Sequence, residues 1–167
     1  MDLAEALFDS WNRQCQIVNA VASLVNEGNR HFKPSEDGMA LDGQLAHIHD
    51  TRRFWVSQVA PEQAAGLISA YTDQEETPIA DLDAIKACVV ASGEAVLAAV
   101  RVGLENGGPM SGPHAVYDNP VLLLQHMVWH EGWHVGLICL ALRLNGQEPP
   151  QEWEESNVWG MWRTETW

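Results

Sequence analysis

The sequence predicts an all-α fold, an up-down-type four-helix bundle with a tryptophan-rich C-terminal tail. Four long segments repeat apolar residues at intervals of three and four, the period of a helix with one buried face. No segment shows the sustained apolar and polar alternation, with β-branched enrichment, that a strand needs. Proline, glycine and asparagine mark the ends of the four segments.

The first two predicted helices cover residues from about 2 to 28 and from about 40 to 60. Asp2 stands at the N-cap position of the first helix, and Gly28 stands where that helix should stop. Pro61 limits the second helix, because proline within a helix removes a hydrogen bond. A short helical stretch is expected to follow over residues 62–69.

The third and fourth helices are expected from about Asp81 to just before Asn106, and from Pro120 through Leu144. The alanines of the third helix suit close packing against neighbours. Asn119 caps the fourth helix and Pro120 takes its first position. The loops between helices one and two and between three and four are about ten to thirteen residues long, which suits a compact bundle.

The tail differs in composition from the helices. It holds four of the eight tryptophans within the last fifteen residues: Trp153, Trp159, Trp162 and Trp167. Such aromatic density is rarely left in water, because tryptophan buries a large area. We expect the tail to fold back over the bundle or to pack against a second subunit in a homodimer, with the first alternative favoured.

Composition limits the class of protein. We expect one domain over residues 1–167. A net charge of −14, from 23 acidic and 9 basic residues, argues against nucleic acid or an anionic membrane as partner and favours a partner that is small or cationic, such as a small-molecule substrate. Cys15, Cys88 and Cys139 lack metal or disulfide spacing. No basic leader and no apolar run of about 18 residues is evident, so we expect a cytoplasmic protein.

Three histidines, His126, His130 and His134, recur at four-residue intervals in the fourth helix. Residues four apart lie on one helix face, and neutral imidazole is a ligand for zinc, nickel and iron. His126 and His134 are about 12 Å apart along the axis, which is too far for one ion. One adjacent pair should therefore bind a metal together with a ligand from another helix.

The second helix offers His47 and His49 as that further ligand. Helical phase favours His49, which shares the apolar face with Leu45 and Val56, but the pattern leaves both open. Five of the seven histidines fall on predicted helices, which raises the odds of a shared site above the ordinary interpretation of a lone surface histidine. Asp50 and Glu131 are candidate carboxylates for orienting the imidazoles.

Together these features resemble the DinB/YfiT-like family of four-helix-bundle metalloenzymes, which is distinct from the DNA polymerase of that name. The resemblance rests on His47 within Leu-Ala-His-Ile, on Arg52-Arg53-Phe54-Trp55, on the His130 and His134 pair, and on residues 158–163, so it covers nearly the whole chain. It implies that the metal ligands are His47, His130 and His134, and that the protein forms a homodimer.

The resemblance also implies a reaction class. A three-histidine site leaves coordination positions open, and a bound divalent ion lowers the pKa of a water or thiol there. Similar proteins include bacillithiol-using S-transferases, a mycothiol-dependent maleylpyruvate isomerase and the N-terminal domain of ergothioneine-forming enzymes. The expected activity is that of a metal-dependent enzyme, a thiol-dependent S-transferase or isomerase acting on small electrophiles. Its cofactors would be zinc, nickel or iron and a low-molecular-weight thiol.

Two alternatives remain at the level of sequence. His130-Glu131-Gly132-Trp133-His134 matches the HExxH pattern of zinc hydrolases, with Glu131 as general base. Those enzymes hold substrate along a strand edge, and this chain predicts no strand. The other alternative is a dimeric, metal-binding stress protein without turnover, which the fold alone does not exclude.

Overall fold

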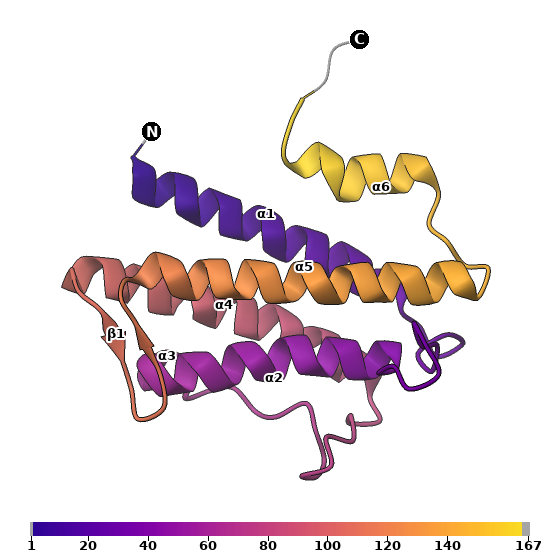
Figure 1. Ribbon diagram of the computed structural model, residues 1–167, viewed down its shortest axis with the longest axis horizontal. Coiled ribbons are helices and arrows are strands. Elements are labelled where there is room, and N and C mark those ends of the chain that lie inside the picture. The colour runs from indigo at the N-terminus through magenta and orange to yellow at the C-terminus, as the bar shows by residue number, and fades with distance from the viewer. Residues whose placement is uncertain (1, 165–167) are drawn as a thin grey trace.

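Four long helices form the core of the computed structural model, which describes residues 2–164 (Figure 1). The long helices are α1 (Leu3–Leu24), α2 (Leu41–Val59), α4 (Leu82–Asn106) and α5 (Pro120–Leu144). Shorter elements are α3 (Pro61–Ala64), α6 (Gln151–Asn157) and a 3-10 turn at Trp159–Met161. The predicted mostly helical fold is confirmed. Trp167 lies outside the described residues.

The ends of the helices show which local signals operate. α5 begins at Pro120 and ends at Leu144, as predicted. α1 stops at Leu24 rather than near Gly28, because the Asn29 side chain donates a 3.0 Å hydrogen bond to the Leu24 carbonyl and ends the helical pattern. The stretch expected over residues 62–69 is only the single turn of α3.

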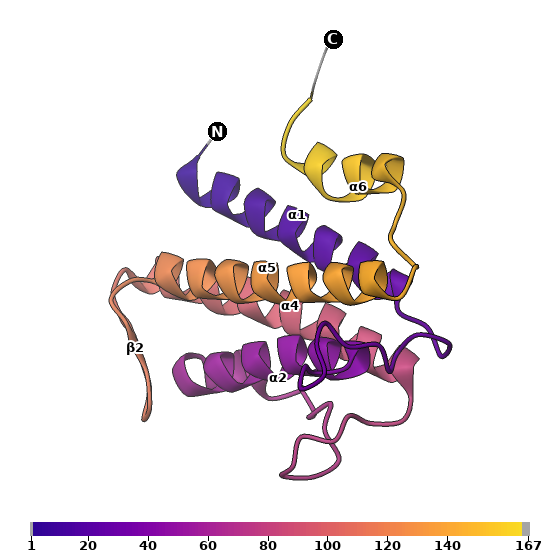
Figure 2. The ribbon, with the colours of Figure 1, turned by 45° about the vertical axis from the view of Figure 1, so that its right-hand side comes forward.

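The long helices do not alternate in direction (Figures 1 and 2). His49 of α2 contacts the Cys88 carbonyl of α4. Arg52, three residues further along α2, contacts the Val89 carbonyl and lies beside Gly93, so α2 and α4 are parallel. α1 and α5 are parallel to each other and run the opposite way. This order corrects the predicted up-down order. Residues 60–81 are long enough to return the chain to the start of α4 beside α2.

Two short strands interrupt the helical fold, although the sequence predicts none. β1 (Met110–Ser111) and β2 (Val116–Tyr117) form an antiparallel hairpin between α4 and α5. Strands of two residues are too short to show an alternating pattern. The hairpin also passes very close to α2, because a Cβ atom on Gly112 would lie 1.6 Å from the Gln58 carbonyl oxygen. This tertiary contact is invisible to local pattern analysis.

α4 is the central apolar helix. By length and composition it is apolar enough to cross a membrane, and half of its most apolar window is buried inside the protein. The prediction that no apolar run reaches that length is therefore wrong. Its small residues admit close neighbours: Gly93 lies beside Cys15 of α1 and Arg52 of α2. The apolar character of α4 thus corresponds to contacts with α1, α2 and α5.

The tail folds back toward α1, which agrees with the favoured expectation (Figure 1). The Arg13 side chain of α1 donates a 2.6 Å hydrogen bond to the Met161 carbonyl, and Trp153 packs against the core. Trp159 and Trp162 remain about half exposed. The tail therefore covers the bundle only in part.

Candidate metal centre

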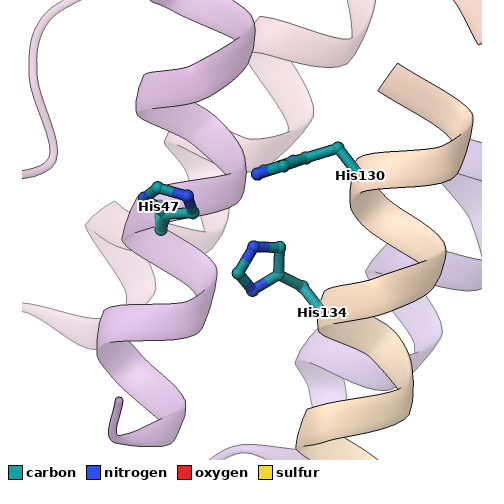
Figure 3. A group of neighbouring side chains, drawn as sticks. All are labelled: His47, His130 and His134. Atoms are coloured by element: carbon teal, nitrogen blue, oxygen red, sulfur yellow. The ribbon is translucent and has the colours of Figure 1, made fainter. Parts of the chain in front are cut away.

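Three of the predicted histidines meet between α2 and α5. His47 on α2 faces both His130 and His134, which lie one turn apart on the neighbouring, antiparallel helix α5 (Figure 3). Each residue offers one ring nitrogen, and these nitrogens lie within 4.8 Å of one another. The ring centroids are 4.5 to 5.1 Å apart. The structure therefore brings together the three residues that the family resemblance selects.

A glutamine on α2 orients one of these rings. His134 Nδ1 donates a short hydrogen bond to Gln44 Oε1, and both side chains are buried. That bond leaves Nε2 of His134 free to face the cluster. Sequence reasoning missed Gln44 and proposed Asp50 and Glu131 instead, although Gln44 precedes His47 by three residues and so shares its face of the helix.

Two imidazoles of the cluster, those of His130 and His134, are held in the neutral form. Burial, together with the neighbouring rings of His134 and His47, lowers the pKa of His130 to about 3. Burial and His47 lower the pKa of His134 to about 4. Nδ1 of His130 is buried and has no hydrogen-bond partner within residues 2–164. Neutral imidazoles with an unsatisfied nitrogen fit a borderline divalent ion such as zinc, nickel or iron.

A threonine hydroxyl lies at the edge of the cluster. Thr51 Oγ1 is 3.5 Å from His47 Nε2 and 3.4 Å from His130 Nε2. Thr51 follows His47 by four residues, so the same face of α2 supplies both groups. The sequence analysis did not select it. It gives the cluster a hydroxyl that can both donate and accept hydrogen bonds.

His49 serves a different part of the structure. Its Nδ1 lies 2.7 Å from the Cys88 carbonyl oxygen and its Nε2 lies 2.7 Å from the Ile68 carbonyl oxygen. The side chain is fully buried, and both nitrogens are engaged away from the cluster. The phase argument for His49 fails because α2 packs against two helices: His49 faces α4, whereas His47 faces α5.

His126 lies one helical turn before His130 but is outside the cluster. Its Nδ1 is 2.9 Å from the Tyr117 hydroxyl, and its ring meets Trp55 at a centroid distance of 5.4 Å. Burial lowers its pKa. As the sequence argument requires, only one adjacent pair from α5 joins the cluster.

Glu131 points away from the cluster and into the core. Its carboxylate accepts a 2.7 Å hydrogen bond from Arg52 Nε and a 3.2 Å bond from Gln14 Nε2. Neither Glu131 nor Arg52 is more than 1% exposed. Both carboxylate oxygens are engaged, so Glu131 cannot reach a water at the cluster. This geometry is incompatible with the general-base role that the HExxH interpretation gives it.

Comparison with known proteins agrees with the sequence resemblance. A family model described as DinB family matches residues 1–160 of the 167-residue chain. Neither the curated proteins nor the solved structures include a match.

Proposed function

The chain belongs to the DinB family, and from this premise we propose that it is a metal-dependent enzyme holding one divalent ion through His47, His130 and His134. The observation that carries the proposal is the meeting of three buried or half-buried imidazoles, two of them with strongly lowered pKa values, from two helices. The ion would be zinc, nickel or iron, since all three accept imidazole ligands.

The proposed reaction is attack of a low-molecular-weight thiol on a small electrophile, as an S-transferase or isomerase. An ion held by these three imidazoles would have open coordination positions and would lower the pKa of a thiol or water bound there. In this proposal Gln44 fixes the His134 ring, and the Thr51 hydroxyl offers a hydrogen bond to the incoming group. Phe54 and Trp55 line the groove beside His47 and Thr51 and give that wall aromatic surface.

The access that a small molecule has to the cluster favours a catalytic site over a site that only binds a metal ion. A groove of about 430 Å³ has His47 and Thr51 in its wall, which is the size of a small-molecule site. A bundle that only stored an ion would have no need of a groove beside it. A non-catalytic metal-binding protein is therefore the weaker alternative.

The first experiment is elemental analysis of untagged protein beside three variants. His47→Ala and His130→Ala should lose a near-stoichiometric metal, and His49→Ala should keep it because His49 is bonded elsewhere. Wild-type protein that stays empty after reconstitution would refute the proposed site. Metal-loaded protein is then assayed with a panel of thiols and electrophiles. Turnover that requires both the metal and a thiol would support the proposed enzymatic activity.

We also propose a homodimer, which the tail and the family resemblance led us to expect. The outer face of α5 exposes Trp129 by 73% and Trp133 by 61%, beside Leu140 and Leu144. Exposed apolar stripes of this kind mark interfaces. Sedimentation of wild type against Trp129→Arg tests it: the wild type should be a dimer that the variant weakens, and a monomeric wild type would refute the proposal.

A further inference from the structure

The groove beside the three-histidine cluster has two walls of different origin. α2 contributes His47, Thr51 and Trp55, and the crossover segment, residues 60–81, contributes Tyr71 and Glu76. A molecule that approaches the cluster through this groove therefore touches the crossover segment. The chemistry of that wall bears on which molecules are accepted.

Carboxylates outnumber cations in the groove. Asp50, Asp73 and Glu76 line it, and Arg53 is the one basic residue in its lining. The Arg53 guanidinium is already ion-paired with Asp50, since its Nε and Nη2 both lie 2.8 Å from Asp50 Oδ1. The second oxygen of Asp50 accepts a 2.7 Å hydrogen bond from the backbone of Ala70 and fastens the crossover segment to α2. The paired charges cancel, which leaves two carboxylates.

The two remaining carboxylates differ in their partners. Hydrogen bonds from Thr77 hold the pKa of Asp73 below its usual range, so Asp73 is ionised. Asp73 also accepts a 3.2 Å hydrogen bond from the Thr72 hydroxyl, so both of its carboxylate oxygens accept hydrogen bonds from neighbouring residues of the crossover segment. Glu76 has no hydrogen bond or ion pair to any residue in the range 2–164. Its charge is available to a ligand.

Aromatic rings complete the groove. Phe54 is 44% exposed and meets Trp55 edge to face at 5.0 Å, and Tyr71 lies on the opposite wall. The Tyr71 hydroxyl is buried without a hydrogen-bond partner in the described part of the chain. Burial and the charges of Glu76 and Asp50 raise its pKa, so it stays protonated. Aromatic faces beside carboxylates attract organic cations.

We infer that this groove binds the cationic end of a small amine-bearing molecule whose other end carries a donor atom for the ion at the cluster. An aminothiol has both features. The inference rests on the proposed function and narrows its substrate class. Glu76 attracts the ammonium group, the aromatic walls cover its methylenes, and the same carboxylate disfavours an anionic group at that end of the ligand.

The test uses cobalt-loaded protein and three thiols of similar size, namely cysteamine, 2-mercaptoethanol and mercaptoacetate. Sulfur-to-cobalt charge-transfer absorption reports binding without turnover. Because the three thiols differ in acidity, the decisive quantity is the change in each Kd caused by Glu76→Gln. We expect a roughly two- to fivefold loss for cysteamine, the size of one partly solvated charge pair, and none for 2-mercaptoethanol. Mercaptoacetate should bind no more weakly than before.

Glu75→Gln is the matched control, since it removes the same charge from the adjacent, exposed position that does not line the groove. Its three Kd values should stay at wild-type level. Equal effects of the Glu75 and Glu76 substitutions, or a weakened mercaptoacetate complex in Glu76→Gln, would overturn the inference. Added salt should shrink the cysteamine preference.

A second measurement separates this inference from the metal proposal. Metal-free protein is titrated with phenethylammonium and with phenethyl alcohol, and tryptophan fluorescence is followed. We expect the cation to bind more tightly and Glu76→Gln to abolish the difference. If the protein takes up no cobalt, the metal proposal fails, and this titration alone then tests whether the groove prefers a cation. Equal binding of the two compounds would refute the cation preference even in a protein that holds metal.

Discussion

Removal of the Glu131 carboxylate should be among the most damaging single changes in this protein. In Glu131→Gln the Arg52 guanidinium stays buried at 1% exposure without its counter-ion. Arg52 keeps its bond from Nη1 to the Val89 carbonyl at 2.7 Å, and the glutamine amide oxygen can still accept a bond from Nε, but no negative charge remains beside the guanidinium, whose Nη2 already has no partner among residues 2–164. Breaking a buried pair on one side costs about 3 kcal/mol or more, because the remaining charge is not solvated.

In a domain of this size such a loss lowers Tm by roughly 6–12 °C. Circular dichroism during heating and urea titration of metal-free protein measures it. Glu148→Gln is the control, because its partner Arg143 lies 2.6 Å away on the surface and an exposed pair is worth about 1 kcal/mol or less. Arg52→Met with Glu131→Met should recover most of the lost stability. A Glu131→Gln variant as stable as the Glu148 control would refute the reasoning.

Four further predictions concern stability and metal. His49→Ala should cost about 2–4 kcal/mol in urea unfolding, since it removes two carbonyl contacts and leaves a cavity, while metal content stays unchanged. Metal-free protein should lose stability as the pH falls from about 6.5 toward 4. In the unfolded chain His130 and His134 take up protons near pH 6.5, whereas in the folded protein their pKa values are about 3 and about 4. A flat urea midpoint over this range would contradict the neutral state of His130 and His134. Gly112→Ala should destabilise by about 1 kcal/mol or more, because its Cβ meets the carbonyl at the end of α2, whereas Gly108→Ala, which has open space, should melt near wild type. A chelator should lower the Tm of metal-loaded protein, and equal melting with and without the chelator would argue against a bound ion.

Local signals account for the parts of the fold that were predicted well. Proline at the first turn and Asn145-Gly146 at the end define α5 because they act within a few residues. The sequence pattern does not predict the features of the fold that depend on contacts between distant parts of the chain. The shared direction of α2 and α4 and the hairpin at Gly112 depend on packing that helical periodicity does not encode.

The same distinction explains the candidate site. Four-residue spacing predicted that an adjacent pair on α5 would share an ion, and His130 with His134 is that pair in space. Periodicity could not choose His47, because α2 is buried on two sides and phase distinguishes only one buried face from solvent. Gln44 and Thr51 were missed, yet they stand three before and four after His47, a spacing that is readable in the sequence.

The three-histidine cluster and the far wall of the groove beside it come from different parts of the chain, because the crossover segment between the parallel helices α2 and α4 supplies that wall. The three clustered histidines, which could hold a metal ion, are on the long helices, whereas residues 69–76 of the connection supply the far wall of the groove. Loops tolerate substitution and length change at little cost, since doubling a loop adds only about 0.6 kcal/mol. A library confined to this connection would therefore vary the far wall of the groove while the three-histidine cluster stays constant, and natural divergence has the same route open to it.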